Sequence, residues 1–180
     1  YYAKNHLVPF GEYKPLPIIT ERLYKMMDMP LADFQKGGDN QAPLTMKDQK
    51  VAFNICYEDG FGDELIATAK RSTLLANISN MAWYGKSNAM YQQLQQSQAR
   101  AMELGRYMVR ATNTGATAII SPKGTIVAEA QPDTETVLEG HVKGYIGETP
   151  YMKAGGSTWL ISILAVIGVF LILIGRKKPE

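Results

Sequence analysis

The sequence has one cysteine among 180 residues and almost no net charge. A single thiol cannot pair within the chain, which excludes a small disulfide-stabilised scaffold. The formal net charge of +2 comes from the final residues, 176–180, because residues 1–175 carry equal numbers of acidic and basic side chains. A body without a basic excess argues against a nucleic-acid-binding protein, which needs a concentrated positive surface. With 46% hydrophobic residues, the chain is also too apolar to be disordered.

Recognisable metal and nucleotide motifs are missing from the sequence as well. The two histidines, His6 and His141, have no partner at a metal-binding spacing, and we interpret both as structural. No glycine-rich phosphate-binding fingerprint occurs. We therefore expect no metal and no cofactor.

What the sequence does contain is a long apolar run near its C-terminus. Residues 157–175 carry no charge, and as a helix these 19 residues span about 28 Å, the thickness of a bilayer core. A buried core helix would normally keep a polar stripe, whereas only Ser162 breaks this run, so we expect a transmembrane helix. The basic tail, residues 176–180, predicts a cytoplasmic C-terminus. Residues 1–150 would then form a domain on the outer side, joined to the helix by a linker at 151–156.

The first residues suggest a longer protein. The chain opens on Tyr1-Tyr2-Ala3-Lys4, without an initiator methionine, and enters a segment that we predict to be extended. A domain seldom begins in the middle of a strand. We therefore expect these residues to be the C-terminal part of a larger chain.

Periodicity predicts alternating strands and helices along residues 1–150. The expected strands are 51–55, 73–78, 107–111, 116–120, 125–128 and 136–142, and the expected helices are 63–70 and 89–104. A short helix is expected at 21–27, between Thr20 and Pro30, and a loop at 33–49. Strands alternate with helices first and pair as hairpins later, with a turn at Ser121–Gly124, so the fold class is α/β.

The longest predicted helix, 89–104, has an apolar face. Its expected inward positions are Tyr91, Leu94, Ala101, Met102 and Leu104. Arg100 and Glu103 are spaced i and i+3, which is most simply a salt-bridged pair.

The single cysteine lies where a nucleophile would be exposed. Cys56 ends the strand predicted at 51–55 and precedes a turn and a helix, the strand–turn–helix geometry of a nucleophile elbow. The positive potential at a helix N-terminus favours a thiolate. The competing interpretation is a buried structural cysteine, which is the more common role of a lone cysteine.

Three motifs in order, Lys4–Tyr13, Asn54–Glu58 and Asn77–Lys86, resemble the nitrilase (carbon-nitrogen hydrolase) superfamily. The later stretches Arg100–Glu103 and Arg110–Gly124 fit the same superfamily. The resemblance is closer to its membrane-bound branch, the apolipoprotein N-acyltransferases, and it covers essentially the whole chain. It implies a nitrilase-like α-β-β-α sandwich, incomplete at its N-terminus, followed by one C-terminal transmembrane helix.

The resemblance also assigns residues. Cys56 matches the nucleophile of the Glu-Lys-Cys triad, and Lys4 matches the lysine, which as an ammonium would stabilise the oxyanion. Glu12 and Glu58 match two further carboxylates, expected to hold Lys4 charged and oriented, and Tyr57 is the residue beside the nucleophile. The alternatives are a solvated turn residue for Glu12 and a favourable charge at a helix N-terminus for Glu58.

At other positions the sequence lacks or departs from what the resemblance implies. The triad glutamate, the general base, has no counterpart in these residues, so we expect residues 1–180 alone to be inactive. Trp83 and Tyr84 are expected to form a mobile loop beside the lipid chains, with core filling as the alternative. Two positions depart from the resemblance, which implies Asp at the position of Met81 and often His at that of Gln93.

The implied function is transfer of an acyl chain. A membrane phospholipid would donate the chain to Cys56 as a thioester, and the α-amino group of a diacylglyceryl-cysteine at an apolipoprotein N-terminus would accept it. The expected location is the inner membrane, with several spans in the full-length protein and the catalytic domain in the periplasm. Two alternatives stay open: a membrane-tethered nitrilase-type amidase, and a non-catalytic membrane-anchored interaction domain in which Cys56 is inert.

Overall fold

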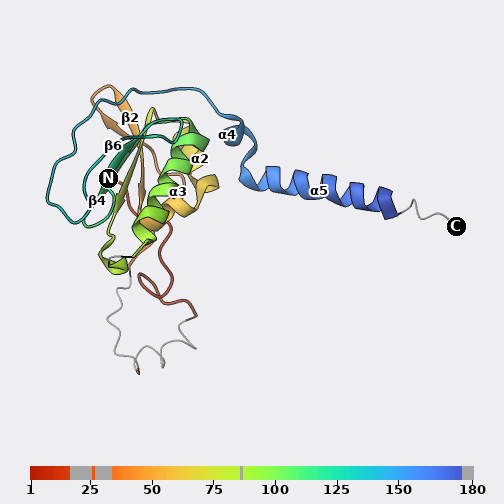
Figure 1. Cartoon of the computed structure of the whole chain (residues 1–180), viewed down its shortest axis with the longest axis horizontal. Helices are drawn as coiled ribbons and strands as arrows, with labels where there is room; N and C mark the ends of the chain where they lie inside the picture. The colour runs from red at the N-terminus through yellow and green to blue at the C-terminus, as the bar shows by residue number, and fades with distance from the viewer. Residues whose placement is uncertain (17–25, 27–33, 86, 176–180) are drawn as a thin grey trace.

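One mixed six-stranded sheet organises the protein, with the strand order β1-β2-β3-β4-β5-β6 (Figure 1). The structure is a computed structural model and describes residues 1–16, 26, 34–85 and 87–175. The strands are β1 (Leu44–Met46), β2 (Gln49–Ile55), β3 (Leu74–Ser79), β4 (Met108–Thr112), β5 (Ala118–Ile120) and β6 (Ile126–Glu129). The helical elements are η1 (Cys56–Gly60), α2 (Gly62–Ala69), η2 (Ala82–Tyr84), α3 (Ala89–Leu104), α4 (Pro150–Ala154) and α5 (Gly156–Gly175).

The centre of the sheet is parallel and its edges are antiparallel. β2, β3 and β4 run parallel, while β1 pairs antiparallel with β2, and β5 and β6 continue antiparallel from β4. A parallel connection needs a crossover, which α2 and α3 provide on the same face of the sheet (Figure 1). The expected α/β class is therefore confirmed, and β2 and β3 bring their C-terminal ends to one edge.

The two faces of the sheet differ in how well they are covered. Beneath α2 and α3 lies the main apolar core, which includes Ala52, Leu75, Leu94, Leu104, Met108 and Ile120. The opposite face has a smaller cluster around Val51, Leu74 and Ala76, and an apolar groove of about 370 Å³ runs along it. Ile78, which lines this groove, is 52% exposed. The described residues thus supply one sheet and one helical layer of the expected sandwich.

Most predicted elements are confirmed, and the differences have physical causes. The predicted helix at 89–104 matches α3, but Tyr91 and Met102 are exposed, and Gln93 and Ser97 are buried in their place. The loop expected at 33–49 contains β1, which pairs with β2 through a tight turn where Lys47 has φ +55°. The helix expected at 21–27, with Thr20 and Pro30, lies outside the described residues.

The strand predicted at 136–142 is wrong. Residues 130–149 contain neither helix nor strand, and Val137 is 82% exposed, so its β-branched side chain has no face of a sheet to cover. This segment is held by side chains instead. Arg106 is buried and donates to the carbonyl oxygens of Ser72 and Gly147, and Thr149 Oγ1 donates to the carbonyl oxygen of Glu103.

The final helix, α5, begins against the body and then extends away from it (Figure 1). It has 20 residues with a mean hydropathy of 2.6 over its most apolar window, and no residue of α5 is buried. By length and composition it is able to cross a membrane. The basic tail, residues 176–180, lies outside the described residues.

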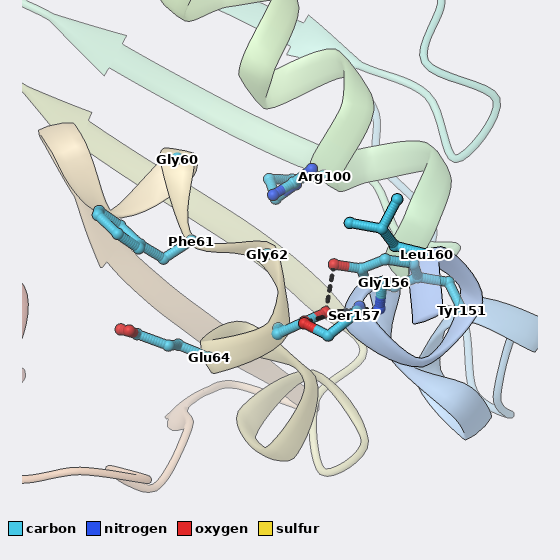
Figure 2. Close-up of a pocket in the computed structure, with 10 residues that line it drawn as sticks. Gly60, Phe61, Gly62, Glu64, Arg100, Tyr151, Gly156, Ser157 and Leu160 are labelled. Atoms are coloured by element: carbon cyan, nitrogen blue, oxygen red, sulfur yellow. Dashed lines mark hydrogen bonds between the residues drawn. The ribbon is translucent and has the colours of Figure 1, made fainter. Parts of the chain in front are cut away.

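A single carboxylate fastens the start of α5. Asp63, in the first turn of α2, accepts hydrogen bonds from the Tyr151 hydroxyl and the Gly156 backbone through Oδ1, and from Ser157 through Oδ2. These donors lower the pKa of Asp63 to about 2, the Gly156 backbone contributing most. Figure 2 shows the cleft of about 370 Å³ beside this junction, lined by Arg100, Tyr151 and Leu160 among others.

Candidate active site

Cys56 stands at the elbow between β2 and η1. Its backbone has φ +54°, a left-handed conformation that costs a non-glycine residue about 1–3 kcal/mol and is concentrated at functional sites. The thiol is partly exposed. The strand–turn–helix arrangement predicted for Cys56 is therefore present, with the short helix η1 inserted before α2. A fully buried structural cysteine does not fit this position.

Glu58 ties the elbow to the N-terminal segment. Its carboxylate accepts hydrogen bonds from the backbone N–H groups of Asn5, His6 and Ile55, at 2.5, 3.0 and 2.5 Å, and from the Tyr2 hydroxyl at 2.9 Å. We expected Glu58 to hold the Lys4 ammonium. It instead fixes the backbone that follows Lys4, at 3% exposure.

Lys4 is held by Glu12. Lys4 Nζ lies 2.7 Å from both Oε1 and Oε2 of Glu12, and the side chains are 10% and 23% exposed. Glu12 Oε2 also accepts the backbone N–H of Val8 at 2.8 Å, which fixes the carboxylate. Glu12 is thus an ion-pair partner of Lys4, as expected, and not a free turn residue.

Tyr84 links this ion pair to the cysteine. Burial raises the pKa of Tyr84, and the nearby Cys56, Tyr57 and Glu12 raise it further, so these groups lie within electrostatic range of one hydroxyl. Tyr84 and Trp83 are 45% and 77% exposed, which excludes core filling for both rings.

The aromatic residue after the cysteine belongs to a ring cluster. Tyr57 makes edge contacts with His6 and Phe61, at centroid distances of 5.8 and 5.1 Å. His6 stacks on Phe61 at a centroid distance of 3.4 Å, and its Nδ1 lies 3.3 Å from a carboxylate oxygen of Glu64. Within the described residues, no group of three or more His, Cys, Asp or Glu side chains is placed to hold a metal ion.

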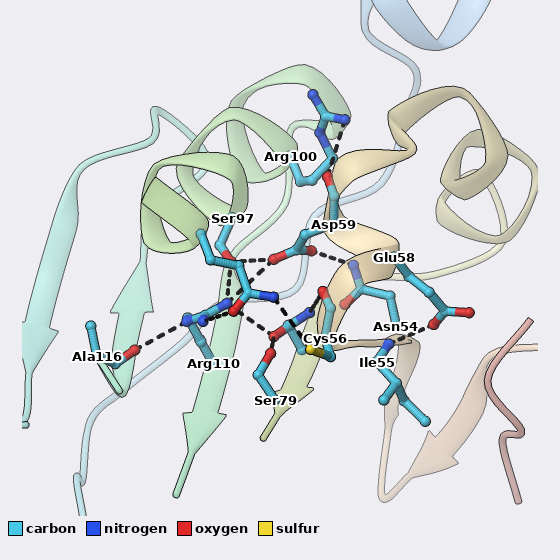
Figure 3. A network of polar contacts seen from close by, with 12 residues as sticks. Asn54, Ile55, Cys56, Glu58, Asp59, Ser79, Ser97, Arg100, Arg110 and Ala116 are labelled. Atoms are coloured by element: carbon cyan, nitrogen blue, oxygen red, sulfur yellow. Dashed lines mark hydrogen bonds and ion pairs between the residues drawn. The ribbon is translucent and has the colours of Figure 1, made fainter. Parts of the chain in front are cut away.

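A fully buried polar network lies beneath Cys56 (Figure 3). At its centre, the Arg110 guanidinium from β4 lies 3.5 Å from Asp59 Oδ2, and neither side chain has any exposure. Asp59 also accepts hydrogen bonds from Ser97 and Asn54. This network joins η1, α3 and the centre of the sheet directly behind the elbow.

Burial and charge oppose each other in this pair. Burial raises the pKa of Asp59, while the hydrogen bonds from Ser97 and Asn54 and the charge of Arg110 lower it. Burial likewise lowers the pKa of Arg110, and the nearby Asp59 and Cys56 raise it. Arginine keeps its proton in proteins, so Arg110 places a cation under the thiol.

The two departures from the resemblance have clear positions. Gln93 takes part in the network and donates its Nε2–H toward Cys56 Sγ at 3.7 Å. Met81 is 1% exposed, and a Cβ on Gly115 would lie 2.7 Å from its Cγ, so Met81 makes a close packing contact at the position where the resemblance led us to expect Asp.

Sequence reasoning missed the rest of the network, although signals were present. Arg110 is a charged residue inside an apolar strand pattern, and Ser97 lies four residues after Gln93 on the inward face of α3. Polar residues at buried positions need partners, so these two positions predict a hydrogen-bonded cluster. The pair of Arg100 with Glu103 was predicted and is confirmed, at 2.6 Å.

Comparison with known proteins agrees with the geometry. The chain is 78% identical over 178 residues to an apolipoprotein N-acyltransferase of Neisseria meningitidis serogroup B, covering 99% of this chain and 35% of that protein. It is 54% identical over 180 residues to the apolipoprotein N-acyltransferase of Chromobacterium violaceum, covering 100% of this chain and 35% of that protein. The chain therefore spans about a third of the length of these relatives.

Solved structures share the fold. The NitFhit protein of C. elegans matches with a TM-score of 0.53 at 20% identity, covering 73% of this chain and 31% of that chain. A carbon-nitrogen hydrolase from Helicobacter pylori G27 matches with a TM-score of 0.50 at 13% identity, covering 57% and 43%. The sequence model of the carbon-nitrogen hydrolase family matches residues 1–151. The elbow cysteine, the paired lysine and these matches together establish that the chain belongs to the carbon-nitrogen hydrolase family.

Proposed function

We propose that this chain carries the thiol nucleophile of an apolipoprotein N-acyltransferase. The observation that carries the proposal is Cys56 at φ +54° on the elbow after β2, with Cys56 and Glu12, the partner of Lys4, both within electrostatic range of Tyr84. The high identity to relatives named apolipoprotein N-acyltransferase supports this choice of reaction.

The reaction would proceed in two steps through a thioester. Cys56 Sγ attacks the ester carbonyl of a membrane phospholipid, the C–S bond forms, and the C–O bond breaks to release the lysophospholipid. The α-amino group of a diacylglyceryl-cysteine at an apolipoprotein N-terminus then attacks the thioester, and the thiol is restored. The thiol proton moves to a general base and on to the leaving oxygen, and the amine proton returns by the same route.

Lys4 would stabilise the negative oxygen of each tetrahedral intermediate. Its ammonium is held by both oxygens of Glu12 at 2.7 Å and is only 10% exposed, so it is oriented before the substrate binds. Removing one such donor typically slows acyl transfer 10²- to 10³-fold. We expect the general base to be a glutamate that precedes Lys4 in a longer chain.

We assign α5 to the membrane. Its 20 residues span about 30 Å as a helix and none is buried, so the bilayer is the environment that would cover its side chains. The Asp63 contacts to residues 156–157 would then hold the elbow near the bilayer surface, where a phospholipid ester is found. With the basic tail in the cytoplasm, as the positive-inside rule predicts, the catalytic domain would lie on the periplasmic side of the inner membrane.

The test is detection of the thioester. The whole protein in detergent micelles is incubated with phospholipid, and its intact mass and Cys56 peptide are measured, with Cys56→Ala as the control. We expect an added acyl mass on Cys56 that a lipopeptide amine discharges to an N-acyl product. No adduct on the wild-type protein would contradict the proposal, and discharge by water but not by the amine would favour an amidase.

A further inference from the structure

We propose that Gln93 stabilises the thiolate form of Cys56 by donating its side-chain N–H to Sγ. Arg110 is the positioning residue that keeps this N–H, and not the amide oxygen, turned toward the sulfur. The inference rests on the proposed role of Cys56 as a nucleophile. It is carried by contacts that converge behind the elbow, around the residues that Figure 3 shows.

The orientation of the Gln93 amide follows from the chemistry of its neighbour. Gln93 Oε1 lies 2.7 Å from Arg110 Nη2, and a guanidinium has donors but no acceptor. The amide must therefore present its oxygen to Arg110, which turns Nε2 and its two hydrogens toward Cys56 Sγ at 3.7 Å. If the amide were reversed, its Nε2–H would point at the Arg110 N–H, and two buried donors would face each other without an acceptor.

The Arg110 guanidinium is itself held in one orientation by several hydrogen bonds. Its Nε donates to the carbonyl oxygen of Ala116 at 3.1 Å, and its Nη1 donates to Asn77 Oδ1 and Ser97 Oγ at 3.0 and 2.9 Å. The same nitrogen lies 3.5 Å from Asp59 Oδ2, and the side chain is fully buried. Partners from β3, η1, α3 and the turn between β4 and β5 thus fix the guanidinium from several directions.

The hydrogen-bond contacts of the sulfur differ between its neutral and its charged form. A protonated Cys56 would donate to the carbonyl oxygen of Asn80 across 4.0 Å, a long contact, whereas a thiolate accepts from the Gln93 N–H at 3.7 Å. A hydrogen bond to a charged acceptor is about twice as strong as one between neutral groups. The Gln93 contact therefore gains strength when the thiol loses its proton.

Charged and titratable groups also face Cys56 from the packed elements. Arg110 in β4 favours the thiolate, and Asp59 in η1 partly offsets that cation. Tyr84 in η2 also interacts electrostatically with Cys56, and Tyr84 is in turn within range of Tyr57 and of Glu12, the partner of Lys4. None of these groups changes in Gln93→Leu, which adds no charge, so a shift of the alkylation midpoint in that variant reports the loss of the amide.

The test is the pH dependence of alkylation of Cys56 by iodoacetamide, which reacts with the thiolate. The whole protein in detergent micelles is used, and modification is read on the Cys56 peptide by mass spectrometry. We expect Gln93→Leu to move the midpoint of the profile about one unit higher, which corresponds to about tenfold slower alkylation at neutral pH. Gln93→Glu keeps an acceptor for Arg110 but places an oxygen against the sulfur, so its midpoint should move further.

The matched control is Gln98→Leu on the same helix, which removes an amide that donates to the carbonyl oxygen of Gly124 at 2.7 Å, away from the sulfur. We expect its midpoint to equal that of the wild type. A Gln93→Leu or Gln93→Glu variant that folds and keeps the wild-type midpoint would overturn the inference. Because Gln93→Glu retains the contact with Arg110, a failure of Gln93→Leu to fold leaves the test intact.

The alkylation test of Gln93 can fail or succeed independently of the thioester test of the proposed function. Alkylation requires no phospholipid, so an unchanged midpoint contradicts the role of Gln93 alone. A wild-type protein that shows the Gln93 effect but never carries an acyl chain on Cys56 contradicts the proposed acyl transfer alone.

Discussion

Replacing Arg110 with methionine should destabilise the protein strongly. Arg110 and Asp59 have no exposed side-chain surface, and the guanidinium also supplies donors to Gln93, Ser97 and Asn77. Methionine fills similar space but leaves the Asp59 carboxylate buried without its cation. Breaking a buried ion pair in this way typically costs about 3–5 kcal/mol, a large share of the roughly 5–15 kcal/mol that stabilises a domain.

The assay is thermal unfolding of the purified protein in detergent, followed by circular dichroism. For a domain of this size each kcal/mol corresponds to about 2–4 °C, so Arg110→Met should lower the melting temperature by about 6–20 °C. Arg71→Met is the control, because Arg71 is exposed and its partners among the described residues are the carbonyl oxygens of Ala67, Asn40 and Gln41. Its loss should stay within about 1 kcal/mol.

A double variant separates the charge from the packing. Adding Asp59→Leu to Arg110→Met removes the unpaired carboxylate, so the double variant should be more stable than the sum of the two single losses by about 1–3 kcal/mol. Strictly additive losses, or a change below about 2 °C for Arg110→Met alone, would refute the idea that the pair is one buried unit.

Three further changes test other parts of the site. The folded pKa of Asp63 is lowered to about 2, so its carboxylate stabilises the wild type above pH 3.8, and this stability is lost as the pH falls through about 2. Asp63→Asn should remove that contribution. Because Asp63 is exposed, we expect the two proteins to differ by less than about 1 kcal/mol in melts run from pH 6 to pH 2. Gly62→Ala should cost about 1–3 kcal/mol in the same melts, because its Cβ would meet the Arg100 guanidinium and the Tyr151 hydroxyl, which Glu103 and Asp63 hold in place. Gly60→Ala meets no atom within 4 Å, so equal losses for the two variants would contradict the packing argument. Lys4→Met should slow thioester formation by 10²- to 10³-fold in a rapid-quench measurement, and Glu12→Gln by less, because the lysine remains; similar rates for Lys4→Met and wild type would remove the oxyanion role.

The parts of the fold that the sequence predicts well are those set by local patterns. α3 follows its predicted bounds, 89–104, and the strand before Cys56 is where alternation and the following helix require it. The short strand β1 escaped prediction because three residues are too few for a periodic signal, and its existence depends on pairing with β2.

The site likewise has residues that local motifs predict and contacts that only the folded chain determines. Cys56, Lys4 and Glu12 were predicted from motifs, and their arrangement agrees with the ion pair and the elbow. The role of Glu58 toward the Asn5 and His6 backbone was not predictable, because which N–H groups lack partners depends on the folded path of a segment more than 50 residues away. The buried network likewise joins α3, β4 and η1, and no local window contains all three.

A force applied along α5 would reach the body through several contacts at once. Asp63 holds the start of the helix, Thr149 holds the turn before it, and Arg106 grips the carbonyl oxygen of Gly147 just upstream. These attachments act in parallel, so the force is shared by α2, by the C-terminal end of α3 and by Arg106 before it can separate β6 from the edge of the sheet. The irregular segment 130–149 is itself held near its C-terminal end, by Arg106 and by the Tyr145 backbone N–H, which donates to the carbonyl oxygen of Thr73 at 3.0 Å, so little of a pull on α5 would pass along this segment to β6.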